Sequence, residues 1–147
     1  MPSLSYQITT INRCARAFRA KRLEGTDLLV PHIHYILIIC ANPGATQDAL
    51  VKNLYTGKSN VTRALSKLEE LGYIERRTCE SDKRAQRVYP TAKAEEILPL
   101  CRQIERDWNA VLTETLCDGE KSTLEDLVQK IATAARHGAE NLSGDNK

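Results

Sequence analysis

Aromatic residues are scarce in this 147-residue chain: they make up 5% of it, with one tryptophan and one phenylalanine. A core with so few rings has to be built mainly from leucine, isoleucine, valine and alanine, which suits helices. The length corresponds to about one domain. A hydrophobic content of 41% and a charged content of 27% are ordinary for a globular protein and argue against wholesale disorder.

Long apolar runs and cysteine pairs are missing as well. The longest apolar run, residues 35–41, is far too short to cross a bilayer, and the first 24 residues contain no apolar segment of a secretory signal. The five cysteines, at positions 14, 40, 79, 101 and 117, include no C-x-x-C, which argues against a disulfide framework or a zinc site. The sequence therefore predicts a cytoplasmic protein without membrane attachment.

Signatures of catalysis are also missing. The chain contains no nucleophile elbow, no cluster of metal ligands and only three histidines. The triplet Gly57-Lys58-Ser59 has the form of the end of a phosphate-binding loop, but Lys52 stands where that loop requires its first glycine. We therefore expect no enzymatic activity, no metal and no cofactor.

Positive charge is concentrated in the middle of the chain. The net charge is +2, yet residues 52–90 hold nine basic and five acidic side chains, whereas residues 91–147 hold seven and eleven. A local excess of cations is typical of a segment that meets a polyanion such as nucleic acid.

The spacing of apolar residues predicts a mainly α chain with helices at both ends. Residues 31–40 could form a helix or a buried strand, and we favour a helix because their apolar side chains fit one helical face. The start of the last helix is open, since Asp118 or Ser122 could cap it. The terminal helices carry apolar stripes that so small a core leaves unburied, which suggests a partner: Leu4, Ile8, Ile11, Ala15 and Phe18; Ile97, Cys101, Ile104, Trp108 and Val111; and Leu124, Leu127, Val128 and Ile131.

The middle segment has the order of a winged helix-turn-helix. Thr46 can cap a short helix, and a second helix follows over residues 58–71, closed by Gly72. Two short strands then flank the polar tip CESDKRA, residues 79–85. We expect residues 1–27 to form an N-terminal dimerisation helix, 28–93 the DNA-binding lobe, 94–137 C-terminal dimerisation helices, and 138–147 a disordered tail.

The helix over residues 58–71 has one apolar and one polar face. Val61, Leu65 and Leu68 lie on the apolar face, together with Ala64 and Leu71. The polar face carries short hydrogen-bonding side chains and cations, the residue types that contact base edges and phosphates in a major groove. A solvated helix would more often interleave glutamate and lysine, so the sequence favours duplex DNA as the partner.

The stretches PGATQDAL and KSNVTRALSKLEELGYIERR, and Asp82-Lys83-Arg84 followed by V-Y-P-T-x-K, resemble transcriptional regulators of the MarR family. The resemblance implies a homodimer on a pseudo-palindromic operator, with helix 58–71 in the major groove and the wing, residues 79–87, at the minor groove. It also implies a repressor released by a small anionic or phenolic effector. Asp82 would steady the wing by pairing with a cation, and the residues expected to bind DNA are Thr46, Lys58, Ser59, Asn60, Thr62, Arg63, Ser66, Lys67, Lys83, Arg84 and Arg87.

Weaker candidates remain beside this interpretation. His32, His34 and Tyr35 could border an effector pocket, although residues two apart on a helix point to different sides. Cys14, flanked by cations, could sense oxidants in a redox-responsive regulator of the same fold. A winged helix that contacts another protein is a further alternative. Gly57 departs from the family pattern because a serine or threonine cap is usual there.

Overall fold

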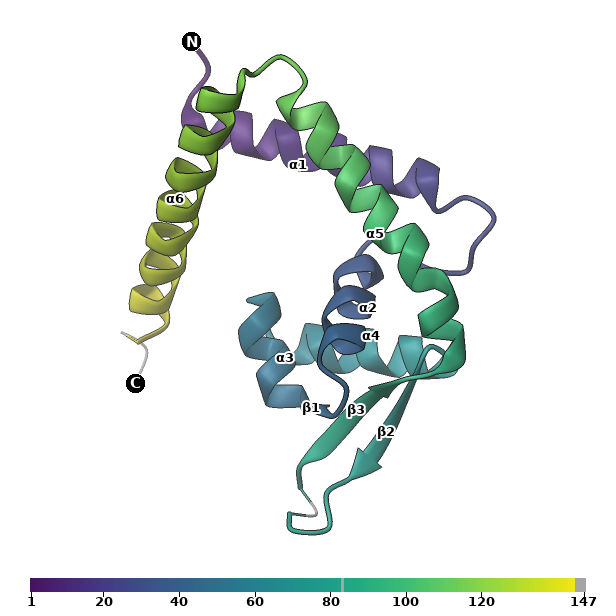
Figure 1. Cartoon of the computed structure of the whole chain (residues 1–147). Helices are drawn as coiled ribbons and strands as arrows, with labels where there is room; N and C mark the ends of the chain where they lie inside the picture. Colours follow the sequence, from purple (N-terminus) through teal and green to yellow (C-terminus); the bar gives the residue numbers. More distant parts are fainter. Residues whose placement is uncertain (83, 145–147) are drawn as a thin grey trace. The chain divides into compact units, whose positions relative to one another are not determined.

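The computed structural model describes residues 1–82 and 84–144. Within these ranges the chain forms six helices and three short strands, so the predicted mainly α winged helix-turn-helix fold is confirmed (Figure 1). The chain divides into two compact units, Met1–Trp108 and Asn109–Lys147. The elements are α1 (Leu4–Arg22), α2 (His32–Ala41), β1 (Ala45–Thr46), α3 (Gln47–Leu54), α4 (Lys58–Glu70), β2 (Ile74–Thr78), β3 (Gln86–Pro90), α5 (Ala92–Thr113) and α6 (Asp118–Gly144).

The wing is an antiparallel sheet in the order β1-β3-β2, and the two-residue strand β1 was not predicted. Strand β1 is held at its start by the Arg87 guanidinium, which donates to the Gly44 carbonyl at 2.8 Å. Gly44 has a φ of +84°, and a Cβ atom built there would lie 3.2 Å from the Tyr89 hydroxyl oxygen. Only glycine therefore combines this backbone conformation with this close approach.

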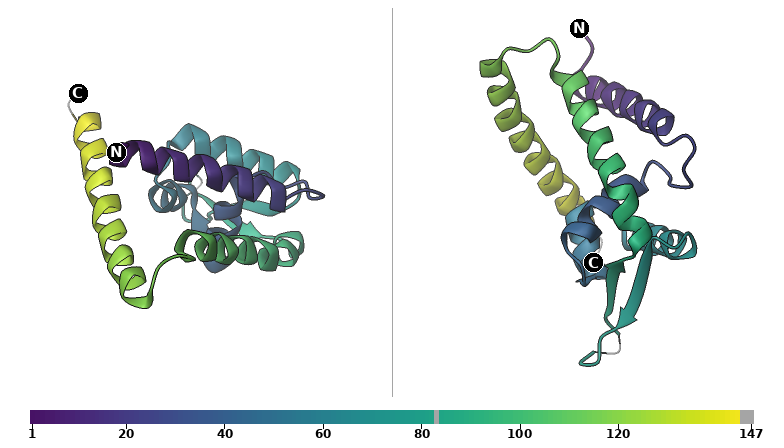
Figure 2. Two further views of the ribbon diagram at one scale, coloured as in Figure 1. Left: turned by 90° about the horizontal axis from the view of Figure 1, so that it is seen from above. Right: turned by 45° about the vertical axis from the view of Figure 1, so that its right-hand side comes forward.

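Helix α2 runs through the middle of the first unit, where α3, α4 and α5 surround it (Figures 1 and 2). Its β-branched run forms a helix rather than a strand, because its apolar residues meet apolar neighbours from several helices. Ile33, Ile36 and Ile39 are at most 1% exposed. They belong to one core with Leu50 of α3, Leu65 and Leu68 of α4, Val88 of β3 and Ile104 of α5.

Within the first unit, α1 is fastened to α5 by charge pairs and rings. Arg19 forms a two-point pair with Glu105, with N–O distances of 2.7 and 2.9 Å, and Phe18 packs on Trp108 with ring centroids 5.3 Å apart. The predicted stripe on α5 is thus largely buried by its own chain as far as Trp108. The first half of α1 is different, since its apolar side chains stay 46–61% exposed: Leu4, Ile8 and Ile11.

In the second unit, α6 begins at Asp118, so neither of the two expected caps occurs: Asp118 is the first residue of the helix, Ser122 lies inside it, and Cys117 precedes it. The Glu120 carboxylate accepts a hydrogen bond from the Cys117 backbone N–H at 2.9 Å and so satisfies one free donor at the helix start. The apolar stripe of α6 is 38–52% exposed along its length: Leu124, Leu127, Val128 and Ile131.

The disordered tail predicted from residue 138 differs from the structure, in which α6 continues to Gly144. Gly138 costs a helix interior only about 1 kcal/mol relative to alanine. The residues after it, Ala139, Glu140 and Leu142, are good helix formers, so the helix is not broken there.

No helix among residues 1–82 and 84–144 combines the length and the apolar character that a membrane crossing requires.

Candidate nucleic-acid interface

Helix α4 separates its side chains as the sequence predicts. Val61, Leu65 and Leu68 are fully buried in the core, while Ala64 and Leu71 are half-buried. The helix ends at Glu70, one residue before the predicted end, and Gly72 follows with a φ of +83°. The opposite face is exposed along the whole helix and carries Ser59, Asn60, Thr62, Arg63, Ser66 and Lys67.

The start of α4 has no side-chain cap. Gly57 occupies the cap position in an extended conformation, and the hydroxyl of Thr56 instead accepts a long hydrogen bond from Asn60, at 3.5 Å. The helix thus lacks the serine or threonine cap that is usual in the family, and the preceding Thr56 does not cap it either. Backbone N–H groups in the first turn of an uncapped helix are free to bind an anion.

Two hydrogen bonds organise the polar face of α4. Arg63 Nη2 donates to Asn60 Oδ1 at 2.5 Å, so the guanidinium is held along the helix surface. Thr62 Oγ1 lies 2.7 Å from Nε2 of Gln47, the first residue of α3. Lys67 pairs with Glu70 at 3.3 Å, an exposed contact of little energetic value.

Helix α3 begins as predicted, with Thr46 as its cap. The Thr46 hydroxyl accepts the Ala49 N–H at 3.2 Å, which engages the hydroxyl that the sequence assigned to DNA. A cleft of about 390 Å³ opens at this point, between the start of α3, the start of α4 and the wing. Its lining contains two cations and one carboxylate: Thr46, Gln47, Asp48, Lys58, Arg84, Ala85 and Gln86.

The wing tip is shaped by hydrogen bonds from the turn backbone to Asp82. The Asp82 carboxylate accepts the backbone N–H of Arg84 at 3.0 Å, and its carbonyl accepts the N–H of Ala85 at 3.1 Å. Among the described residues it forms no ion pair with a cation. A short acceptor side chain that binds the backbone two residues ahead stabilises a tight turn without any cation. The Arg84 side chain is exposed, and Lys83 lies outside the described residues.

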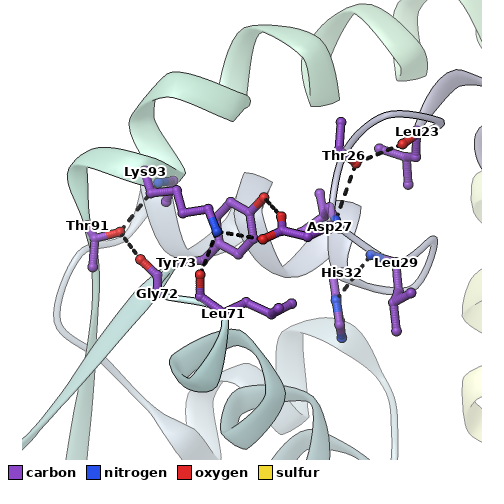
Figure 3. Close-up of polar contacts among 12 residues, drawn as sticks. Leu23, Thr26, Asp27, Leu29, His32, Leu71, Gly72, Tyr73, Thr91 and Lys93 are labelled. Atoms are coloured by element: carbon purple, nitrogen blue, oxygen red, sulfur yellow. Dashed lines mark hydrogen bonds and ion pairs between the residues drawn. The ribbon is translucent and has the colours of Figure 1, made fainter.

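A polar network joins the end of α4 to the start of α5 and to the segment before α2 (Figure 3). Lys93 Nζ lies 2.6 Å from Asp27 Oδ2 and 2.6 Å from the Leu71 carbonyl oxygen. The buried Tyr73 hydroxyl donates to the other Asp27 oxygen, and Thr91 Oγ1 donates to the Gly72 carbonyl at 2.6 Å. Side chains from the start of α5 thus bind the carbonyls of the two residues that follow α4, which ties the end of the helix to α5.

The contacts in this network shift the pKa values of Asp27 and Tyr73 in opposite directions. The hydrogen bond from Lys93, followed by that from Tyr73, holds the pKa of Asp27 below its ordinary value. Burial and the neighbouring Asp27 carboxylate raise the pKa of Tyr73 far above its ordinary value, so its hydroxyl stays a donor. A second pair supports the same helix, because the hydrogen bond from Arg76 of β2 lowers the pKa of Glu69 on α4.

Replacing Tyr73 by phenylalanine is expected to lower the free energy of unfolding by about 1 to 2 kcal/mol, because the hydrogen bond from the buried tyrosine to the exposed Asp27 carboxylate is lost. Urea titration measures this loss. The lowered pKa of Asp27 implies that its contribution is present above about pH 4 and is lost as the pH falls through the folded value. The difference between parent and variant should therefore narrow in acid. Tyr6→Phe, on exposed α1, is the matched control, and an equal loss there would contradict the assignment.

The three candidate pocket residues do not share one environment. His32 is 4% exposed, and its Nδ1 lies 3.4 Å from the Leu29 N–H, so it packs and caps within the chain. Tyr35 is also buried, and its ring meets that of His32 edge-on. His34 is exposed, with Nε2 3.5 Å from Glu105. As expected for residues two apart, the two histidines point to different sides.

The cysteines of the described residues are all unpaired. Cys14 is exposed on α1. A hydrogen bond with the Ser81 hydroxyl, 3.1 Å away, lowers the pKa of Cys79 in the wing to about 7, whereas burial raises the pKa of Cys101 to about 11. Within the described ranges, no three His, Cys, Asp or Glu residues are grouped as metal ligands.

Helices α3 and α4 with their exposed polar face and the adjoining wing define a winged helix-turn-helix protein, a class whose second helix enters a DNA groove. Residues 26–85 match the model of the MarR family. A relative described as the uncharacterised HTH-type transcriptional regulator YybA of Bacillus subtilis (strain 168) is 24% identical over 147 residues, which is 100% of this chain and 98% of the relative.

Solved structures agree with this match. The crystal structure of MarR is 26% identical, with a TM-score of 0.81 over 95% of each chain. A MarR family transcriptional regulator from Listeria monocytogenes, crystallised with a 26mer DNA, is 24% identical, with a TM-score of 0.91 over 100% of this chain and 98% of that one. At this level of identity, the second comparison shows a shared fold. Over residues 26–85 the chain is thus similar to the MarR family of transcriptional regulators, and the proteins that it resembles are described as regulators rather than enzymes.

Proposed function

We propose that this regulator binds a pseudo-palindromic operator as a homodimer, with α4 in the major groove and residues 79–87 at the minor groove. The observation that carries the proposal is the exposed face of α4. Ser59, Thr62, Arg63 and Ser66 are exposed there, directly opposite the fully buried Val61, Leu65 and Leu68. Short hydroxyls and a guanidinium on a rigid helix suit base edges better than they suit bulk solvent.

The proposed contacts fall into two classes. We propose that Arg63, with Ser59 and Asn60 beside it, contacts base edges, while the uncapped start of α4 and the wing cations contact phosphates and the minor groove. Asp82 supports the wing turn. The DNA-facing set is Thr46, Lys58, Ser59, Asn60, Thr62, Arg63, Ser66, Lys67, Arg84 and Arg87.

The homodimer is proposed from the apolar side chains that the single chain leaves uncovered. The α6 stripe of Leu124, Leu127, Val128 and Ile131 and the exposed first half of α1 are regularly spaced apolar surfaces on long helices. Contiguous apolar surface of this kind marks an interaction site in a globular protein. Two copies would place two α4 helices about one turn of DNA apart.

We further propose that the protein is a cytoplasmic repressor released by a small anionic or phenolic effector, as the family resemblance implies. The unpaired cysteines fit a reducing compartment. Of the three candidate pocket residues, His34 offers an exposed side chain to a ligand, since His32 and Tyr35 are buried. The exposed Cys14 is the candidate site if release depends on an oxidant.

Selection of duplexes from a randomised library tests the proposal. The full chain is incubated with the library under reducing conditions, without added ligand. Enrichment of an inverted repeat with half-sites one helical turn apart is the expected result. Weak binding without enrichment would contradict it and would favour a winged helix that contacts a protein.

Replacing Arg63 by alanine is expected to relax the base preference at one position of each half-site. An arginine that pairs with guanine O6 and N7 contributes about 1 to 3 kcal/mol of discrimination, or roughly 5- to 150-fold in affinity for the correct base. Quantitative binding to the selected operator and its single-base variants measures the effect. Arg102→Ala on α5 removes an equal, exposed charge away from α4, and the same relaxation there would exclude a specific role of Arg63.

A further inference from the structure

Thr62 contributes one hydrogen to the polar face of α4, and that hydrogen is already used. Thr62 Oγ1 donates to the Lys58 carbonyl at 2.9 Å and lies 2.7 Å from Gln47 Nε2. A hydroxyl has one donor hydrogen and two acceptor lone pairs. Toward Gln47 the Thr62 oxygen must therefore accept, and it has no hydrogen left for a base.

This contact fixes the orientation of the Gln47 amide. Because Thr62 can only accept, the NH₂ group of Gln47 faces Thr62, and the carbonyl oxygen Oε1 points elsewhere. Over the part of the chain that the structure describes, no other hydrogen bond reaches the Gln47 amide. The amide is left with one acceptor and one further N–H.

The position of Gln47 gives these two groups access to a ligand. The residue is half-buried at the start of α3 and lines the cleft of about 390 Å³ that it shares with Lys58 of α4 and Arg84 of the wing. It therefore lies between the polar face of α4 and two cations suited to phosphates. The sequence did not single out Gln47, since its partner lies fifteen residues further along the chain.

We propose that Gln47 is a specificity-determining residue that binds an adenine, and that Thr62 acts as its positioning residue. The inference rests on the proposed insertion of α4 into the major groove. Adenine presents an N6 donor beside the N7 acceptor there, which complements the Oε1 acceptor and the remaining N–H of Gln47. A phosphate presents acceptors alone and would leave Oε1 without a partner.

The test compares the operator preferences of the parent, Gln47→Ala and Thr62→Val. The parent is expected to select adenine at one position of each half-site. Gln47→Ala should lose that preference, by about 5- to 150-fold against the other bases, and keep the preference that depends on Arg63. Valine has nearly the shape of threonine but lacks the hydroxyl, so Thr62→Val should weaken the preference at the same adenine.

Two further variants separate positioning from direct contact. Thr62→Ser keeps the hydroxyl and is expected to retain the adenine preference. In a Gln47→Ala background, adding Thr62→Val should change nothing at that position, because Thr62 acts through an amide that is no longer there. Thermal melts of all variants confirm that each is folded.

Three outcomes would overturn the inference. Equal weakening of Gln47→Ala on every sequence, with a shallower salt dependence, would make Gln47 a phosphate contact. A further loss on adding Thr62→Val to Gln47→Ala would show that Thr62 contacts a base itself. A parent that enriches no sequence would remove the proposed function, and the inference with it. The parent's own selection distinguishes that failure from the first two.

Discussion

Raising the salt concentration from 50 to 200 mM is expected to weaken operator binding by about 10³- to 10⁵-fold, the range for six to ten phosphate contacts. The chain presents five described cations on the proposed DNA-facing side, and a dimer presents them twice: Lys58, Arg63, Lys67, Arg84 and Arg87. Each cation that neutralises a phosphate releases a condensed counterion, so the logarithm of affinity falls linearly with the logarithm of salt concentration. Fluorescence anisotropy on a labelled operator measures the slope.

The wing cation Arg84 supplies the internal comparison for this experiment. Arg84→Ala removes one contact from each protomer and should make the slope shallower by about 2 for the dimer, with similar weakening on all sequences. Arg102→Ala, which removes a charge from α5, should leave the slope unchanged. A total loss below tenfold over this salt range would contradict a phosphate-bound wing and would favour contact with a protein.

Placing a charge on the apolar stripe of α6 is expected to lower operator affinity by about 10²- to 10⁴-fold. A separated protomer binds its half-site alone, without a second protomer on the other half-site to keep it on the DNA. Leu127 is 50% exposed in the single chain, in the middle of the stripe. In a dimer, Leu127→Asp would bury a carboxylate without a partner, which is costly in an apolar contact. Analytical ultracentrifugation should show half the parental mass.

The matched control for this variant lies on the same helix. Thr133 is exposed and faces away from the stripe, so Thr133→Asp introduces the same charge without touching the proposed contact. Circular dichroism separates dissociation from unfolding, since a folded monomer keeps its helical signal. A Leu127→Asp protein that stays dimeric and binds the operator normally would exclude this stripe as the dimer contact.

Local sequence patterns were enough to predict most of the winged helix-turn-helix. The alternation of buried and exposed positions along α4 follows from its 3.6-residue period, and Thr46 and Gly72 mark the helix ends by their side-chain and backbone chemistry. Helix α2 could be favoured but not decided, because a run of β-branched residues is compatible with a strand until its neighbours are known.

The features that the sequence does not predict depend on contacts between distant residues. Strand β1 has two residues and exists because β3 lies beside it. The α5 stripe is largely covered by the chain itself as far as Trp108, which spacing alone cannot distinguish from coverage by a partner. Gln47 of α3 is oriented by a hydroxyl on α4, and Asp82 accepts a backbone N–H within the wing turn.

The network around Lys93 connects the end of α4 directly to the start of α5 by hydrogen bonds. Thr91 and Lys93, at the start of α5, bind the carbonyls of Gly72 and Leu71 at the end of α4. At 1.5 Å per residue, the thirteen-residue α4 is roughly 20 Å long, so a tilt of about 5° at this connection moves its far end by nearly 2 Å. Such a displacement is enough to break hydrogen bonds to base edges. A small rotation of α5 would thus move α4 most at its far end, where Ser59 lies.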